Sequence, residues 1–377
     1  MREKMIMTPG PTAINEEVRK EMANPITNPD LDLRFFDFYK ETSESLARLL
    51  HTKNEVLILS GEGILGLEAA CASLIEPGDK VLCIDNGFFG RGFGNFVDMY
   101  GGECEYFSSD YRKPVDILKL EKHLKNNNNY KFATFVHCET PSGILNPVGE
   151  ISKLLKSYNI LTVVDMVSSI GGEDVFIDDW KIDIALGGSQ KCLSAPPGLT
   201  ILSVSEDAWG KILNRENKII GYYSNLSIWK NWYNKKKFPY TQPINDIKAL
   251  NKSVKIALAD DKLIEKHKRI AKAVRKSIIN CGLELYPIKG YSNTVTAFKL
   301  PKGINETKIR KHLYNKYHIM IANSLGDLKD VLRIGHMGEN CCEEKVYLTL
   351  KYLDKTLKEH SVNLKDKLHI QFEKNLD

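Results

Sequence analysis

Strand-like and helix-like segments alternate over most of the first 260 residues of this chain. Short apolar runs bounded by turn residues are typical of buried strands, and apolar residues at helical spacing are typical of amphipathic helices. Strands that alternate with helices join through right-handed crossovers and form a mostly parallel sheet. The pattern therefore predicts an α/β fold, with a seven-stranded type of sheet whose strands cover residues 56–59, 81–84, 104–107, 132–138, 160–165, 182–187 and 199–204.

The pattern of predicted helices and strands changes from about residue 263. A long basic amphipathic helix over 263–281 ends at Gly282, and the strands that follow are few and have helices between them. This pattern predicts a smaller α+β unit, in which the last dozen polar residues fray. Because chains longer than roughly 250–300 residues usually divide, we predict a large domain over 1–258 and a small domain over 259–377.

Composition narrows the class of protein. Hydrophobic residues make up 42% of the chain and charged residues 27%, as in ordinary globular proteins. The net charge of +5 is too small to indicate nucleic-acid binding, and no apolar segment approaches the roughly 18 residues of a membrane span or forms a signal peptide. Eight cysteines without a C-x-x-C pair indicate reduced thiols rather than disulfides or a metal site. We expect a cytoplasmic protein with no metal, nucleic-acid or membrane partner.

Two neighbouring strand ends carry the residues with the most distinctive chemistry. The apolar run 160–165 ends in Asp165, and the run that begins at Ala185 leads through two glycines to Lys191. Open α/β sheets bind ligands at the carboxyl ends of their strands. A lysine there can form a Schiff base, and a carboxylate can keep a pyridinium nitrogen protonated, which is what pyridoxal 5′-phosphate (PLP) chemistry requires. The alternatives are a surface lysine and an aspartate that only caps the next turn.

Three more strand ends supply residues suited to such a ligand. The turn Gly61-Glu62-Gly63 can point backbone N–H groups and a positive helix end at a phosphate. Glu62 repels a phosphate, so either its side chain points away or it meets a cation such as a substrate ammonium. Phe89 can stack on a planar ring, and Thr140 can bond an oxygen of the ligand. The alternatives are a tight turn, a core aromatic and an ordinary Thr-Pro-Ser-Gly turn.

Arg333 lies within an apolar strand of the predicted small domain. A buried arginine is costly unless it is paired, and a substrate carboxylate is a good bidentate partner. The alternative partners are the nearby Asp327 and Asp330.

Nine segments carry a resemblance to a known family, and in chain order they are Thr8-Pro9-Gly10-Pro11, Gly61-Glu62-Gly63, Leu67-Glu68-Ala69-Ala70, Asn86-Gly87-x-Phe89-Gly90, Thr140-x-x-Gly143, Val164-Asp165-x-Val167-Ser168, Gly188-Ser189-Gln190-Lys191, Ala195-Pro196-Pro197-Gly198 and Leu332-Arg333-Ile334-Gly335. This order resembles the class V aminotransferases, and within them the alanine–glyoxylate and serine–pyruvate branch. The resemblance implies PLP fold type I, a homodimer with active sites at the subunit interface, and residues 1–20 as an arm at that interface.

The resemblance also implies roles for individual residues. Lys191 matches the Schiff-base lysine and Asp165 the residue that faces the pyridinium nitrogen. The other residues that match cofactor-binding positions are Gly61, Glu62, Gly63, Ile64, Phe89, Thr140, Val167, Gln190, Phe238 and Thr241, the last reaching the partner subunit's phosphate. Arg333 matches the arginine that binds the substrate carboxylate, with Gly10 and Thr140 beside the substrate. Phe238 and Glu62 depart from the family pattern, in which a tyrosine and a small or hydroxyl residue are common.

The implied activity is transfer of an amino group from a small amino acid, of the alanine or serine type, to a 2-oxo acid such as glyoxylate or pyruvate. Alternatives are a 2-aminoethylphosphonate–pyruvate transaminase, a PLP lyase of the cysteine desulfurase type, and a binding module without turnover. The lyase needs a reactive cysteine ahead of the substrate arginine, and the segment 323–331 contains none.

Overall fold

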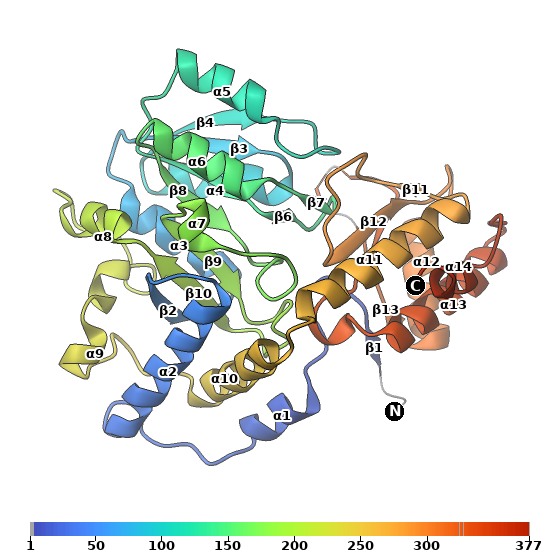
Figure 1. Cartoon of the computed structure of the whole chain (residues 1–377), viewed down its shortest axis with the longest axis horizontal. Helices are drawn as coiled ribbons and strands as arrows, with labels where there is room; N and C mark the ends of the chain where they lie inside the picture. Colours follow the sequence, from blue (N-terminus) through green and yellow to red (C-terminus); the bar gives the residue numbers. More distant parts are fainter. Residues whose placement is uncertain (1–3, 324, 327, 377) are drawn as a thin grey trace.

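The structure, a computed structural model, describes residues 4–323, 325–326 and 328–376. A larger part contains most of the chain up to α10, and a smaller C-terminal part lies beside it (Figure 1). The strands of the larger part, in chain order, are β2 (Glu55–Ser60), β3 (Lys80–Asp85), β4 (Glu103–Ser108), β5 (Phe132–Val136), β6 (Cys138–Glu139), β7 (Ile144–Leu145), β8 (Leu161–Asp165), β9 (Ile184–Gly188) and β10 (Leu199–Val204). Its helices are α1 (Glu16–Met22), α2 (Leu33–Leu49), α3 (Gly63–Leu74), α4 (Phe88–Met99), α5 (Ile117–Asn126), α6 (Val148–Ser157), α7 (Ile177–Trp180), α8 (Glu206–Leu213), α9 (Trp232–Lys235) and α10 (Ile244–Ala259), with a 3-10 turn at Leu226–Trp229.

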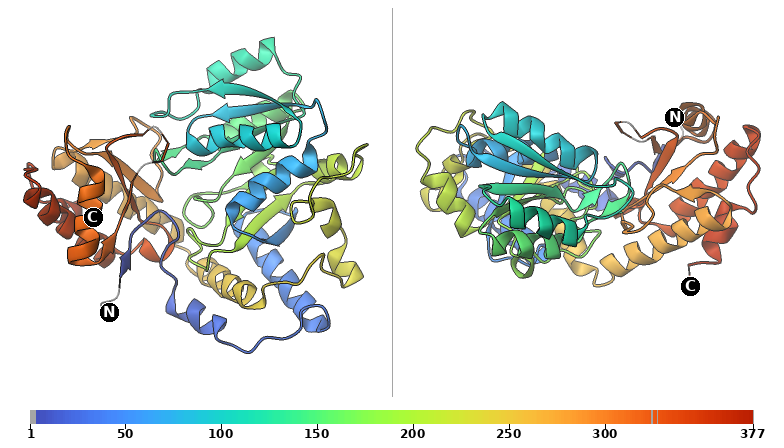
Figure 2. Two further views of the ribbon diagram at one scale, coloured as in Figure 1. Left: turned by 180° about the vertical axis from the view of Figure 1, so that it is seen from behind. Right: turned by 90° about the horizontal axis from the view of Figure 1, so that it is seen from above.

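Seven strands form the central sheet in the order β2-β10-β9-β8-β5-β3-β4. All neighbouring pairs from β9 to β4 are parallel, and only β10 runs antiparallel to both of its neighbours. Helices α3 and α4 pack on one face, whereas α5, α6 and α7 cover the other (Figure 2). The predicted α/β fold with a mostly parallel sheet is therefore confirmed. Its consequence is that the carboxyl ends of β5, β8 and β9 share one edge.

The smaller part contains a four-stranded antiparallel sheet in the order β11-β12-β15-β14. Its elements are α11 (Leu263–Asn280), β11 (Glu284–Leu285), β12 (Val295–Lys299), α12 (Glu306–Tyr317), β13 (Ile319–Met320), β14 (Ala322–Asn323), β15 (Val331–Gly335), the 3-10 turn Gly338–Asn340, α13 (Glu343–Glu359) and α14 (Leu368–Glu373). The expectation that the last dozen residues fray is wrong, because Leu368 and Phe372 of α14 are fully buried in this part's core.

Two main apolar cores divide the molecule. One gathers buried side chains from Phe35 to Val254 and the other gathers side chains from Ile270 to Phe372 together with Met7. Met7 joins the second core because β1 (Met5–Ile6) pairs in parallel with β13, so the N-terminal segment lies beside the C-terminal part (Figure 1). The domain boundary at residue 258 and the role of residues 1–20 as a dimer arm stay predictions. Among the described residues, no helix combines the length and apolarity needed to cross a bilayer.

Candidate active site

Lys191 follows β9 in a turn held by backbone and hydroxyl hydrogen bonds. The Ser189 hydroxyl donates to the carbonyl of Pro196 at 2.5 Å, and the Lys191 Nζ donates to the carbonyl of Pro9 at 2.9 Å. Gly10 borders the lysine so closely that a Cβ there would lie 2.4 Å from the Lys191 Cδ atom. Burial lowers the pKa of Lys191, and the nearby charge of Arg333 lowers it further. The neutral amine needed for attack on a carbonyl is therefore favoured.

Asp165 ends the neighbouring strand β8 and lines the same cavity as Lys191. Its side chain is 5% exposed, and its Oδ1 accepts from the Val167 N–H at 2.8 Å. Burial raises the pKa of Asp165 to about 6, although the hydrogen bond from Val167 and the charge of Lys191 oppose the rise. At neutral pH a buried anion therefore faces a cavity that contains a lysine.

The faces of the cavity are apolar and narrow. Phe89, at the start of α4, lines one part of the wall, and Val167 lines another. Gly63 allows Val167 to reach the cavity, because a Cβ on Gly63 would lie 2.7 Å from the Val167 Cγ2 atom. A flat ring is the kind of ligand that such a slot admits.

Glu139 is a functional residue that the sequence analysis did not single out. Its fully buried carboxylate accepts from the Gly90 N–H at 2.6 Å and from the Phe89 N–H at 3.3 Å. These are free N–H groups of the first turn of α4, which has no side-chain cap of its own. Burial raises the pKa of Glu139 to about 8. Glu139 therefore fixes the helix end that carries Phe89.

At the other end of the cavity, Glu62 caps α3. Its Oε1 accepts from the Ile64 N–H at 3.2 Å, and its Oε2 accepts from the Gln190 side-chain amide at 3.1 Å. Both residues line the cavity together with Glu62. The N–H of Gly61, predicted to bind the cofactor, instead donates to the carbonyl of Gly198 at 2.7 Å, and Gly61 does not line the cavity.

Another part of the cavity wall carries Thr140, and Arg333 lies close enough for its charge to lower the pKa of Lys191. The Thr140 hydroxyl shares a hydrogen bond of 2.7 Å with Ser168, and both line the cavity. Arg333 is 5% exposed on β15, and its Nε donates to the Asn323 carbonyl at 2.6 Å. Burial lowers the pKa of Arg333 to about 10. Among the described residues no carboxylate, Asp330 included, pairs with Arg333, and Asp327 lies outside them.

Two predicted cofactor residues are elsewhere in this chain. Phe238 is buried in an aromatic cluster and stacks on Phe36 with ring centroids 4.4 Å apart, so it does not line this cavity, and its contact with a cofactor stays a prediction. The cluster forms because a phenyl ring, lacking a hydroxyl, packs best among other rings. Thr241 is exposed and its hydroxyl donates to Asp30 at 3.5 Å.

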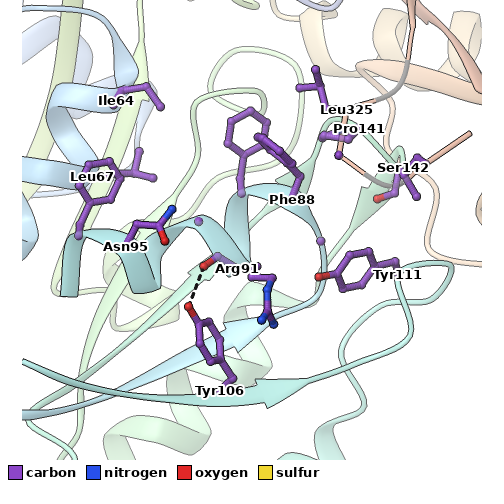
Figure 3. A pocket seen from close by; sticks show the side chains of 16 residues that line it. Ile64, Leu67, Phe88, Arg91, Asn95, Tyr106, Tyr111, Pro141, Ser142 and Leu325 are labelled. Atoms are coloured by element: carbon purple, nitrogen blue, oxygen red, sulfur yellow. Dashed lines mark hydrogen bonds between the residues drawn. The ribbon is translucent and has the colours of Figure 1, made fainter. Parts of the chain in front are cut away.

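A second, more open cavity adjoins the first and shares the side chains of Ile64, Leu67 and Phe89 with it (Figure 3). Arg91 lies on its wall, with its guanidinium 4.7 Å from the centre of the Tyr106 ring. Arg91 already donates to the buried Asp85 at 3.0 Å. The positive charge of Arg91 is therefore already balanced by the carboxylate of Asp85.

A lysine and a buried carboxylate in one slot, at the carboxyl ends of a mostly parallel sheet, define a PLP enzyme of fold type I. Residues 11–327 match the family model for aminotransferase class-V. An uncharacterised aminotransferase of Methanocaldococcus jannaschii is 37% identical over 96% of this chain and 95% of its own. Pyridoxamine–pyruvate transaminase of Mesorhizobium japonicum is 33% identical over 88% of this chain and 86% of its own.

The solved structures agree with the sequence relatives. Ureidoglycine–glyoxylate aminotransferase of Bacillus subtilis superimposes with a TM-score of 0.95 at 30% identity, covering 99% of this chain and 98% of its own. The chain belongs to the class V aminotransferase family, whose members are PLP-dependent.

The residues around the slot fit the ring of PLP. A Cβ on Gly63 would clash with Val167, and a Cβ on Gly10 would clash with Lys191. Glycine at both positions therefore leaves room for these two side chains at the slot. The second oxygen of Asp165, Oδ2, accepts no hydrogen bond from any described residue, as a site for a protonated ring nitrogen requires.

Proposed function

We propose that this protein transfers the amino group of a small monocarboxylic amino acid, such as alanine or serine, to a 2-oxo acid such as glyoxylate or pyruvate. The observation that carries the proposal is the buried guanidinium of Arg333. Its positive charge lowers the pKa of Lys191, and it lacks a carboxylate partner among the described residues. Such a guanidinium binds a carboxylate bidentately. The acceptors named for the relatives above, glyoxylate and pyruvate, support the same substrate class.

The residues of this chain then have separate tasks. PLP, when bound, supplies an electrophilic aldehyde and a ring that stabilises negative charge on the Cα of the amino acid. Arg333 binds the α-carboxylate, and Lys191 Nζ takes the proton from Cα as a general base. Asp165 holds the proton on the ring nitrogen. Phe89 and Val167 keep the ring in place and exclude water from its faces.

A single free guanidinium favours monocarboxylic over dicarboxylic or phosphonate donors. Arg91 pairs with Asp85, and Arg34 is an exposed side chain paired with Asp32 at 3.1 Å. No other arginine lines either of the two cavities in the described parts of the chain. A 2-aminoethylphosphonate donor therefore has no second free cation to bind.

The lyase alternative also lacks its nucleophile. Cys138 is the cysteine that lines the cavity, and burial raises its pKa to about 12, so it stays a thiol at neutral pH. A thiolate is the reactive form of cysteine. Cysteine desulfuration is accordingly not proposed.

The proposal is tested with purified protein loaded with PLP. We expect a visible absorbance band that decays when alanine or serine is added, and decays at least about tenfold more slowly with aspartate, because no second free cation compensates its side chain. Lys191→Ala should lose both the band and the decay, whereas Lys153→Ala, an exposed lysine on α6, should keep both. A Lys191→Ala protein with normal turnover would contradict the proposal.

The proposal includes a homodimer in which Thr241 reaches the partner subunit's cofactor phosphate. Support comes from two exposed side chains near Thr241. Leu31 follows Asp30, whose carboxylate accepts from the Thr241 hydroxyl, and the Tyr222 hydroxyl donates to the carbonyl of Pro239, two residues before Thr241. Leu31 is 78% exposed and Tyr222 is 58% exposed, which is unusual for an apolar patch that stays in water. Light scattering should give twice the mass of one chain, and active protein at the mass of one chain would contradict the dimer.

A cytoplasmic location is also proposed. All eight cysteines are free, and six of them are buried, as expected in a reducing compartment. Fractionation of the native cells, with detection of the protein by antibody, tests the location.

A further inference from the structure

The end of the cavity at α3 presents hydrogen-bond acceptors where the family pattern expects a phosphate. Glu62 occupies the N-terminus of α3 with both carboxylate oxygens engaged, one on the Ile64 N–H and one on the Gln190 amide. Gln190 is 6% exposed, and its Oε1 is buried with no hydrogen-bond partner in the described chain. The free group at this end therefore needs a donor, not a further acceptor.

A phosphate dianion is a poor partner for these groups. It offers acceptor oxygens and two negative charges, and it uses the same N–H groups and positive helix end that Glu62 already occupies. Among the described residues that line the cavity, Lys191 is the only cation. Phe238 has no hydroxyl to offer a phosphate, and its ring is buried among other aromatic rings.

An uncharged hydroxymethyl group is a good partner for the same groups. Its O–H donates to an acceptor, and both a Glu62 oxygen and the unpaired Gln190 Oε1 are acceptors. A buried acceptor left unpaired is costly, so a donor at this point gains binding energy. The ring itself would be held by the same residues as before.

We propose that Glu62 is a specificity-determining residue that weakens binding of the 5′-phosphate and admits the unphosphorylated ring, pyridoxal or pyridoxamine, as a ligand. The inference rests on the proposed function, because it uses the same slot around Lys191 and Asp165. Free pyridoxamine then serves as an amino donor. Its 4′-amine passes to C2 of the 2-oxo acid, the oxo oxygen ends on C4′ as the aldehyde of pyridoxal, and no further oxidant or reductant is needed.

The test measures binding rather than turnover. Protein freed of cofactor is titrated with PLP and, separately, with pyridoxal, and the two dissociation constants are read from the absorbance of the bound ring. Glu62→Gln keeps an oxygen for the Ile64 N–H and removes the charge. We expect it to bind PLP about tenfold more tightly than the natural protein, because one like charge a few ångströms from the phosphate is removed, and to bind pyridoxal no more tightly.

Salt and a second carboxylate cap provide controls. Glu62 is exposed in this chain, so raising the salt concentration should shrink the difference between Glu62→Gln and the natural protein. Asp116 caps α5 in the same way, accepting from the Lys119 N–H, but lies outside the cavity. Asp116→Asn should leave both dissociation constants unchanged.

Three results would overturn the inference in distinguishable ways. In the first, Glu62→Gln and Glu62→Ser both keep the ratio of the two dissociation constants seen in the natural protein, and circular dichroism shows that both variants are folded. Glu62 would then not determine specificity, but the proposed aminotransferase activity would stand. Tight PLP binding together with undetectable pyridoxal binding in the natural protein would also reject it. Absence of binding of either ring would reject the proposed function itself.

Discussion

Arg333 is a charge that the fold buries before any substrate arrives. It lies on β15, between β12 and β14, where its Cα pairs with those of Ala297 and Ala322. Burying a guanidinium without a carboxylate costs stability, and no described residue supplies one, which supports the proposed binding of a substrate carboxylate by Arg333. Its field also reaches Lys191, whose pKa it lowers.

Arg333→Gln should therefore have two effects. The KM for the amino donor should rise about 100-fold, because charged hydrogen bonds of roughly 1.5–3 kcal/mol are lost. The pKa of Lys191 should rise, because a nearby positive charge is removed. Steady-state kinetics and a pH titration of the bound-cofactor absorbance measure these effects, and Arg269→Gln, an exposed arginine paired with Glu343, is the control. An unchanged KM would remove Arg333 from substrate binding.

The residues of the site differ in how far a sequence reveals them. Asp165 and Lys191 could be predicted because parallel strands bring their carboxyl ends to one edge, so a polar residue after an apolar run has a definite place. Glu139 could not be predicted, because its role depends on α4 beginning beside β6. The position of Phe238 could not be predicted either, since aromatic packing around it is decided by α2 and α9.

At the scale of elements, the strand pattern was predictable and several helices were not. The strand over 199–204 has the predicted bounds, and the predicted strands over 56–59, 81–84 and 104–107 lie within β2, β3 and β4. Helix α2 buries apolar side chains such as Phe36 and Tyr39 at helical spacing, but it also buries Thr42, Ser43 and Ser45. Helix α10 likewise buries Asn251 and Ser253. Polar residues that pack inside weaken the apolar periodicity on which such predictions depend.

Helix α4 depends on a carboxylate from another element. Glu139→Ala removes the acceptor for the Phe89 and Gly90 N–H groups, so the helix end and the Phe89 ring lose their fixed position. We expect the dissociation constant of PLP to rise about tenfold, since unpaired buried donors cost roughly 1–3 kcal/mol. Glu139→Gln keeps an acceptor oxygen and should recover most of the affinity. Ser205→Ala, which removes the cap of α8, should leave the affinity unchanged, and an unaffected Glu139→Ala protein would contradict this role.

Helix α14 is part of the smaller core, although half of its residues are polar. Phe372 is fully buried, and Leu368, also fully buried, lies one helical turn before it. Phe372→Ala should therefore lower the free energy of unfolding by about 3–5 kcal/mol, the usual cost of truncating a core phenylalanine. Denaturant unfolding measures this, with the exposed Lys374→Ala as control. Equal stability of the Phe372→Ala and natural proteins would restore the view that this end frays.

At the scale of the whole molecule, burial of carboxyl groups makes the stability of the protein depend on pH. Three carboxyl groups, Asp165, Glu139 and Glu173, are buried, and burial raises their pKa values to about 6, 8 and 7 respectively. Asp165 lines the slot and Glu139 binds the first turn of α4 beside it, whereas Glu173 binds Asn293 and Ser292 of the smaller part. The folded protein therefore binds protons that the unfolded chain releases near pH 4.

The sign of the resulting pH dependence follows from these values. A carboxyl group whose pKa is raised by folding contributes stability that is fully present below about pH 4 and is lost as the pH rises through the folded pKa. The cofactor-free protein should lose roughly 8 kcal/mol of unfolding free energy between about pH 5 and 8.5 from these three groups, since one pKa unit corresponds to about 1.4 kcal/mol. Glu173→Gln, which cannot ionise, should make the decline less steep between about pH 5 and 7, and Glu139→Gln should make it less steep up to about pH 8. Glu150→Gln, an exposed residue on α6, should leave the slope unchanged, and a stability that rises over this range would show that these groups are ionised in the folded protein without cost.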